Sequence, residues 1–189
     1  MDIKCLNGKK CEISCTRACF IFPHPMYTLR QAEPTDCALI QQLATEAFPT
    51  TYRDILTPEQ TAYMMEWMYA PENIARQMAE GHTYLLAYDG SIPVGYASIE
   101  QQGAHLFHLQ KIYVLPQVQG KHCGSFLFRE AVAHIKRLHP APCRMELNVN
   151  RHNKALHFYQ RMGMTILREG DFPIGNGFFM NDYIMGMEL

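Results

Sequence analysis

The residues best suited to chemistry lie in one stretch, 111–125, which reads KIYVLPQVQGKHCGS. Its apolar start predicts a strand, Pro116 ends that strand, and a turn containing glycine leads directly into a helical pattern. The first backbone N–H groups of a helix have no partner within it, and the helix dipole adds partial positive charge there. Because glycine has no Cβ, an anion can approach such a turn closely. The stretch therefore predicts a pyrophosphate site on the turn, from Gln119 to Gly124.

Two better-known phosphate motifs do not fit this turn. A P-loop would end in Gly-Lys-Ser/Thr, and a dinucleotide fingerprint would need three glycines in the first βαβ unit. Neither pattern is present at this position. On these residues alone, an ordinary strand–turn–helix that binds no ligand stays the alternative interpretation.

The composition limits the classes of protein to consider. A length of 189 residues, with 48% hydrophobic and 19% charged residues, is typical of one globular domain. The net charge of -1 argues against a nucleic-acid or membrane-surface partner, although Lys111, Lys121 and Arg129 predict a local basic patch at the turn. No apolar run approaches the roughly 20 residues that span a bilayer. We expect a cytoplasmic protein.

The N-terminal region has a different character from the rest. Four of the seven cysteines fall within the first nineteen residues: Cys5, Cys11, Cys15 and Cys19. They lack the CxxC pairs and histidine partners of common zinc sites, so no metal is expected. The apolar run 18–22 is too short for a signal peptide. Pro23-His24-Pro25 then breaks the chain before a clear strand. We therefore expect an appendage of unknown role at 1–25 and a domain at 26–189, with Met26 as a candidate natural start.

Hydrophobic periodicity predicts the elements that position the turn. We expect strands at 26–30, 83–88, 92–101, 104–115, 144–149, 165–169 and 178–189. Helices are expected at 35–49, 57–70, 72–79, 124–139 and 153–162. Pro49 should stop the first helix, and Thr57-Pro58-Glu59-Gln60 has the pattern of a capping box for the second. The predicted buried stripe of helix 124–139 comprises Leu127, Ala131, Ile135 and Leu138. This order is a mixed α/β domain with one central sheet.

At this point two motifs and the element order resemble the GNAT acetyltransferase superfamily, over roughly 27–189. The family's central motif, Gln/Arg-x-x-Gly-x-Gly/Ala, follows a strand of the Ile-Tyr-Val-x-Pro type. Here residues 112–116 match the strand, and His122 stands where the motif has its first glycine. The second family signature is matched by Asn153, Leu156, Phe158, Tyr159, Gly163 and Met164. The ending at 174–183 resembles a bacterial polyamine or small-amine acetyltransferase subgroup.

The resemblance implies a fold, a cosubstrate and a set of binding residues. The fold would be a mostly antiparallel sheet, splayed at the cofactor site, with helices on both faces. Acetyl-CoA would place its pyrophosphate on the turn and pair its pantetheine arm with the preceding strand like a short added strand. The implied binding residues are Ile112, Tyr113, Val114, Gln119, Gly120, Lys121, His122, Cys123, Gly124, Ser125 and Asn153.

The resemblance also implies catalytic roles. Tyr159 would protonate the departing thiolate. An amine of pKa about 10.4 is almost entirely protonated at pH 7, so a base is needed as well. Glu100 and His108, on strands near the expected splay, are the candidates. Each role has a structural alternative: Tyr159 as a buried helix aromatic, Asn153 as a helix cap, and His108 as a packed strand residue.

These inferences predict an N-acetyltransferase that uses direct attack by a primary amine. The acceptor would be a small amine or polyamine, an amino acid, or a protein N-terminus or lysine. The alternative is a non-catalytic acyl-CoA-binding module, which His122 motivates because a left-handed backbone there would disfavour a non-glycine residue. A homodimer through the C-terminal strands is a further expectation from the resemblance.

Overall fold

The computed structural model describes residues 27–189, so the expected appendage at 1–25, Met26 and the four N-terminal cysteines lie outside the described residues. The strands are β1 (Tyr27–Gln31), β2 (Thr83–Asp89), β3 (Ile92–Gly103), β4 (Leu106–Val114), β5 (Arg144–Asn150), β6 (Thr165–Gly175) and β7 (Phe178–Glu188). The helices are α1 (Cys37–Tyr52), α2 (Pro58–Tyr69), α3 (Pro71–Ala79), α4 (Cys123–Leu138) and α5 (Leu156–Arg161). Two short 3₁₀ turns, η1 (Pro34–Asp36) and η2 (Pro116–Val118), precede α1 and α4.

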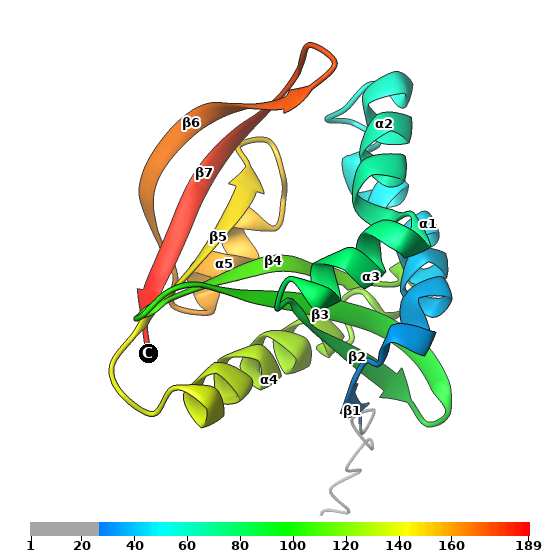
Figure 1. Ribbon diagram of the computed structural model, residues 1–189. Helices are drawn as coiled ribbons and strands as arrows, with labels where there is room; N and C mark the ends of the chain where they lie inside the picture. Colours follow the sequence, from blue (N-terminus) through cyan, green and yellow to red (C-terminus); the bar gives the residue numbers. More distant parts are fainter. Residues whose placement is uncertain (1–26) are drawn as a thin grey trace, which may run out of the picture.

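The strands form one sheet that splits in the middle. Its order is β1-β2-β3-β4-β5-β7-β6, and only the pair β4–β5 is parallel. That pair is short: Leu106 to His108 of β4 face Arg144 to Glu146 of β5, and then the two strands diverge. Figure 1 shows the group β5, β7 and β6 turning away from β1–β4. The expected splayed, mostly antiparallel sheet is confirmed.

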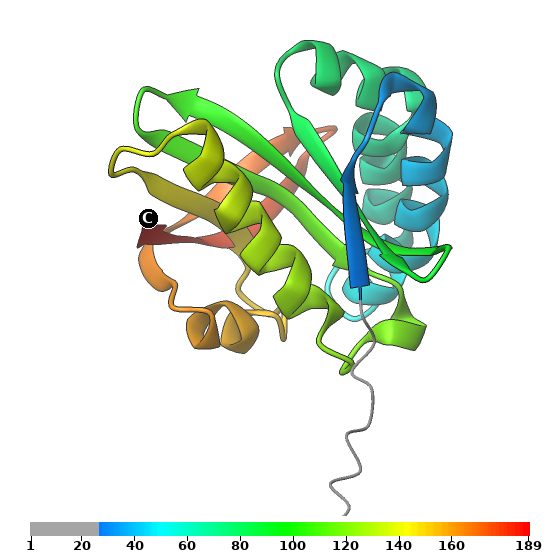
Figure 2. The same ribbon diagram turned by 90° about the horizontal axis from the view of Figure 1, so that it is seen from below.

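Helices cover both faces of the sheet. Helix α4 packs against β1–β4 on one face, and α1 packs against β3 and β4 on the other, together with α2 and α3 (Figures 1 and 2). The stripe on α4 is buried at Leu127, Ala131 and Ile135, as expected. Leu138 is 61% exposed instead, because it is the last residue of the helix, where the chain leaves the sheet toward Pro140.

Helix α1 runs past Pro49 to Tyr52, so the expectation that this proline stops the helix was wrong. Proline removes one backbone donor, but the following turn keeps other hydrogen bonds. The hydroxyls of Thr50 and Thr51 donate to the carbonyls of Glu46 and Ala47 at 2.9 and 2.8 Å. The extra turn carries Tyr52 to the split in the sheet.

The start of α2 confirms half of the expected capping box. The Thr57 hydroxyl accepts from the Gln60 N–H at 3.1 Å. The Gln60 side chain does not return to Thr57. It donates to the carbonyl of Phe179 in β7 at 2.9 Å, so it joins α2 to the far half of the sheet.

Strand β6 is longer than expected, ending at Gly175 instead of residue 169. In the sequence, Gly170 and Pro173 are residue types that usually interrupt a strand. Strand β6 is the edge of the sheet, and an edge strand tolerates proline at positions whose N–H would point away from the neighbouring strand. The result is a long β6–β7 hairpin whose tip lies near α2 (Figure 1).

Candidate active site

A cavity of about 690 Å³ opens where β4 and β5 diverge. This volume lies within the range of small-molecule sites. Its walls come from the end of α1, from β4 after His108, from the turn before α4, and from the segment that joins β5 to α5. The split in the sheet and the start of α4 therefore face the same cavity.

The turn before α4 has the geometry of an anion cradle. Gly120 and His122 both adopt left-handed backbone, with φ of 76° and 67°. The first intrahelical bond of α4 runs from the Phe126 N–H to the His122 carbonyl at 2.9 Å, and no side chain caps the helix. The amides before Phe126 therefore have no partner within the helix. A Cβ on Gly120 would meet no atom within 4 Å, so an anion has open access.

Most of the residues expected to bind the cofactor line this cavity. They are Ile112, Tyr113, Val114, Gln119, Gly120, His122, Gly124, Ser125 and Asn153. Lys121 and Cys123 do not line it: the Lys121 carbonyl accepts a hydrogen bond from the Tyr27 hydroxyl at 3.1 Å, and Cys123 is fully buried. Burial raises the pKa of the Cys123 thiol to about 12, so this cysteine is not poised as a nucleophile.

Strand β4 offers a free edge along the cavity. Residues 109–114 pair with β3 on one side and are not paired with β5 on the other, because the β4–β5 pairing ends at His108. The unpaired backbone groups of such an edge can receive an extended amide chain as an additional strand. This is the edge that the resemblance assigns to the pantetheine arm.

Tyr159 lies on the same cavity wall. It projects from α5, where its ring packs against Phe158 and Phe128 at centroid distances of 5.2 and 6.4 Å. Burial, with Tyr52 nearby, raises the pKa of its phenol, so the hydroxyl stays protonated at neutral pH. Tyr159 is thus a packed aromatic on the cavity wall whose hydroxyl is protonated.

Asn153 fixes the turn that leads into α5. Its side-chain oxygen accepts from the Ala155 N–H at 2.9 Å, and its carbonyl accepts from the Leu156 N–H at 3.1 Å. The helix therefore starts at Leu156, three residues later than expected. Asn153 is therefore not the N-cap of α5, which is Ala155 without a side-chain cap; it stabilises the preceding turn and lines the cavity.

These features agree with a comparison against protein families. The profile described as "Acetyltransferase (GNAT) domain" matches residues 52–170, which is more than half of the chain. The chain belongs to the GNAT acetyltransferase family. As a member of this family, it is an acetyl-CoA-dependent N-acetyltransferase.

Solved structures share this GNAT fold at low sequence identity. The PaiA N-acetyltransferase of Thermoplasma acidophilum, in complex with coenzyme A, has a TM-score of 0.72 and 22% identity, covering 86% of this chain and 99% of that one. YncA of Salmonella typhimurium, a putative acetyltransferase with its cofactor acetyl-CoA, has a TM-score of 0.60 and 22% identity. The match covers 86% of this chain and 94% of that one. The ribosomal-protein-S18-alanine N-acetyltransferase of Escherichia coli has a TM-score of 0.65 and 16% identity. The match covers 86% of this chain and 94% of that one.

Glu100 and His108, the sequence candidates for the base, are cross-strand neighbours that lie beside the cavity of this GNAT domain, not on its wall. Burial acts to raise the pKa of Glu100, but hydrogen bonds from Gln102 and Gln110 outweigh it and leave the pKa lowered. Burial lowers the pKa of His108, so its ring is neutral at pH 7. Its Nε2 lies 3.1 Å from Oδ1 of Asn148.

Tyr52 and Asn148 are among the cavity residues that the sequence analysis did not predict. For Tyr52 a signal existed, because Ala44, Phe48 and Tyr52 continue one helix face at spacings of four. Asn148 lies on β5 beyond its pairing with β4, and no local pattern marks the position where two strands separate.

Lys111 does not join the expected basic patch. Its side chain is buried, and its Nζ donates to Oε1 of Gln77 in α3 at 2.7 Å. The same nitrogen lies 5.5 and 5.8 Å from the ring centroids of Tyr84 and Tyr69. Burial lowers the pKa of Lys111 to about 8.

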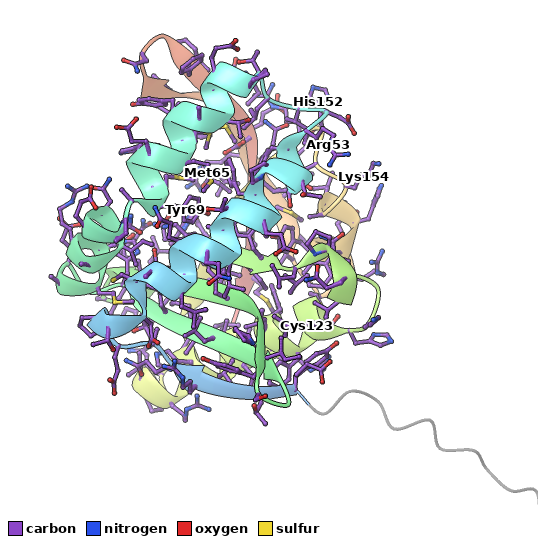
Figure 3. All side chains as sticks on the ribbon, turned by 90° about the vertical axis from the view of Figure 1, so that its right-hand side faces the viewer. Arg53, Met65, Tyr69, Cys123, His152 and Lys154 are labelled. Carbon is purple, nitrogen blue, oxygen red and sulfur yellow. The ribbon has the colours of Figure 1, made fainter. Side chains whose placement is uncertain are left out.

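Basic residues from other elements lie near the outer end of the site. Figure 3 shows Arg53, His152 and Lys154 along one edge of the molecule, from the end of α1 and the segment after β5. Lys154 and Arg161 line the cavity. Within residues 27–189, no group of three or more His, Cys, Asp or Glu side chains could hold a metal ion. In the same residues, no helix has the length and apolar character to cross a membrane.

Proposed function

We propose that this enzyme transfers the acetyl group of acetyl-CoA directly to a primary amine. Acceptors of this chemistry are a small amine or polyamine, an amino acid, or a protein N-terminus or lysine. The observation that carries the proposal is that the anion cradle, the free edge of β4 and Tyr159 all face one cavity. Cys123, the cysteine nearest the cradle, is buried and protonated, which favours direct attack over an acyl-enzyme.

The residues present suit acetyl-CoA along the whole cavity. The amides at the start of α4 would hold the pyrophosphate, with Lys154 and Arg161 as cations within reach of the nucleotide phosphates. The pantetheine amides would pair with β4 between Leu109 and Val114. In this arrangement the thioester lies where β4 and β5 separate, beside Tyr159.

The reaction then needs two proton movements. The neutral amine nitrogen attacks the thioester carbonyl carbon, and the C–S bond breaks as the C–N bond forms. The Tyr159 hydroxyl gives its proton to the departing thiolate and is reprotonated from solvent. The proton lost by the amine passes to a base. Because burial keeps the phenol protonated at neutral pH, Tyr159 is available as this donor.

The amine class has separate support. Structural neighbours named as N-acetyltransferases include the PaiA enzyme and the ribosomal-protein-S18-alanine enzyme. The class of acceptor is therefore proposed as a primary amine, with a small amine or polyamine as the first choice to test.

Thiol release from acetyl-CoA against a panel of amines tests the proposal. The panel holds spermidine, amino acids and a peptide with a free N-terminus. We expect Tyr159→Phe to lower kcat by roughly 100-fold or more, with the KM for acetyl-CoA little changed. Tyr88→Phe, in β2 and away from the cavity, is the matched control and should keep wild-type activity. Saturable acetyl-CoA binding without turnover on any amine would favour the binding-module alternative.

We also propose that copies of the domain pair through the C-terminal strands. Strand β6 is a sheet edge, and Ile166 and Leu167 on it are 43% and 41% exposed. A paired edge would cover these side chains. Sedimentation velocity at micromolar concentration tests this, and a purely monomeric boundary would refute it.

A further inference from the structure

Asp182 in β7 carries a carboxyl group that the described residues leave incomplete. The residue is only 5% exposed. Its Oδ2 accepts from Nδ2 of Asn148 at 3.3 Å, and its Oδ1 is buried with no hydrogen-bond partner among residues 27–189. A buried, half-satisfied carboxylate is expensive in a folded protein and is uncommon without a ligand or ion.

No charged group of the described residues supplies the missing partner of Asp182 Oδ1. Arg151 is the cation that acts on it, but the Arg151 guanidinium contacts Asp171 at 2.8 Å and Glu169 at 3.9 Å. Burial raises the pKa of Asp182, and this outweighs the opposing effects of Asn148 and Arg151. The Asp182 carboxylate therefore has no cation in direct contact among the described residues, and a cationic ligand could supply one.

Asn148 holds the carboxyl group in one orientation and connects it to the cavity. Because its Nδ2 donates to Asp182, its Oδ1 faces His108, whose Nε2 lies 3.1 Å away. Neutral His108 must then donate from Nε2. Asn148 itself lines the cavity at the split, so the carboxyl lies one side chain behind the wall.

Helix α2 covers the part of β7 around Asp182. Gln60 of α2 donates to the carbonyl of Phe179 at 2.9 Å, and its Nε2 lies 3.8 Å from Sδ of Met180. Met180 and Asp182 are two apart in β7, so they share one face of the strand. Helix α2 therefore covers the face of β7 that carries the carboxyl, and Figure 1 shows the β6–β7 hairpin reaching toward α2.

We propose that Asp182 binds the ammonium group of the acceptor and receives the proton that the amine must lose. This inference rests on the proposed acetyl transfer to a primary amine. The acceptor enters as R–NH₃⁺ beside Asn148 and, once that side chain turns aside, pairs with the unpartnered Oδ1 behind it. Transfer of one proton to the carboxylate leaves R–NH₂, whose lone pair forms the C–N bond while the thioester C–S bond breaks. The nitrogen loses its second proton to solvent as the amide forms, and Tyr159 protonates the departing thiolate. Asp182 releases its proton to solvent before the next turnover. His108 and Asn148 act as positioning residues for the carboxylate.

The test compares two nucleophiles in wild type and Asp182→Asn. One is an alkylamine, which is cationic at pH 7, and the other is an aromatic amine, which is neutral at pH 7. We expect kcat/KM for the alkylamine to fall by about 30-fold or more in the variant, because a buried charge pair loses one partner. The value for the aromatic amine and the KM for acetyl-CoA should change little.

Thermal unfolding supplies an independent readout. Asp182→Asn removes a buried charge but keeps the oxygen that accepts from Asn148, so the Tm without ligand should rise by a few degrees. Asp171→Asn is the matched control, since Asp171 is an exposed carboxylate that bonds Arg151 and Asn181 in the neighbouring strand. Asp171→Asn should leave the ratio of kcat/KM for the alkylamine to kcat/KM for the aromatic amine unchanged.

The outcomes separate cleanly. An unchanged alkylamine kcat/KM in Asp182→Asn, or an equal loss for both nucleophiles with a lowered Tm, would show a structural carboxylate and overturn the inference. If wild type acetylates no amine at all, the proposed function fails first, and the role of Asp182 fails with it. Selective loss for the alkylamine with a raised Tm supports the proposal.

Discussion

His122 occupies the position of the motif glycine and holds a left-handed backbone, with φ of 67° and ψ of 5°. This conformation costs a non-glycine residue about 1–2 kcal/mol, although histidine tolerates it better than a β-branched residue. Since the backbone is already left-handed without ligand, the strain lowers the stability of the fold and does not have to be overcome again when acetyl-CoA binds. His122 therefore does not argue against catalysis.

This strain can be measured with two substitutions at one position. His122→Gly and His122→Ala both remove the imidazole, but only alanine keeps a Cβ. We expect the glycine variant to be more stable than the alanine variant by about 1 kcal/mol in urea unfolding. Equal stabilities would mean that the position carries no backbone strain.

Lys111 gives a pH dependence whose direction follows from its pKa. The folded value is about 8, against 10.5 for the free side chain. Between these values the unfolded chain binds more protons than the folded protein, so stability rises with pH across this window. At pH 7 the buried charge lowers the free energy of unfolding by about 3 kcal/mol at most.

Lys111→Met should remove this dependence. Gln77 keeps a partner, because its Oε1 also accepts from the Tyr84 hydroxyl at 2.6 Å. We expect the variant to be more stable than wild type at pH 7 by about 1–3 kcal/mol, with a smaller difference at pH 9.5. Urea unfolding at the two pH values checks this, with the exposed Lys121→Met as control. A constant difference between the two pH values would contradict it.

At the scale of elements, the tip of the β6–β7 hairpin packs against α2. The Tyr63 hydroxyl donates to the carbonyl of Ile174 at 2.8 Å, and its ring lies 5.7 Å from that of Phe178. Gly175 is required at the tip, because its φ is 98° and a Cβ there would collide with the Tyr63 hydroxyl. The hairpin therefore depends on α2 for its position, although the two are more than 100 residues apart in the chain.

Tyr63→Phe should loosen this contact without unfolding the protein. The lost hydrogen bond is worth about 0.5–1.5 kcal/mol. We expect faster amide exchange at residues 174–178 and a raised KM for the amine, with the KM for acetyl-CoA unchanged. Hydrogen-exchange mass spectrometry and steady-state kinetics measure both. Unaltered exchange at the tip would show that the ring contact alone holds the hairpin.

At the scale of the whole molecule, acetyl-CoA should stabilise the fold against unfolding, because residues from both halves of the split sheet line its cavity. At about 100 times its dissociation constant, a ligand that binds only the folded state stabilises it by about 2.7 kcal/mol. For a domain of this size that corresponds to a rise in Tm of about 5–10 °C.

A substitution in the cradle separates binding from folding. Gly124→Asp places a carboxylate at the start of α4, where it favours the helix dipole but repels phosphate. A Cβ there would meet only Phe158, at 3.8 Å, so the variant should fold. We expect a wild-type Tm without ligand and no shift with acetyl-CoA in differential scanning fluorimetry. A full shift in the variant would place the pyrophosphate elsewhere.

Much of this architecture could be predicted because it depends on local patterns. The strand, glycine turn and helix from 111 onward, and the cap at Thr57, follow from backbone preferences over a few residues, and the structure has them in place. The same holds for Asn153 and Tyr159, whose motif spacing brings both to the cavity. Errors came where a neighbouring element compensated a local breaker, as at Pro49, where two threonine hydroxyls bond the last turn, and at Pro173 on an edge strand.

By itself, the sequence determined the fold class, the anion cradle and the two motifs that mark a GNAT acetyltransferase. Only the tertiary structure decided where β4 and β5 part, and therefore which side chains meet at the split. His108, Asn148 and Asp182 come from β4, β5 and β7, and their contacts join residues up to 40 positions apart. Such a group has no spacing to recognise, because strand order and register, not chain order, bring it together.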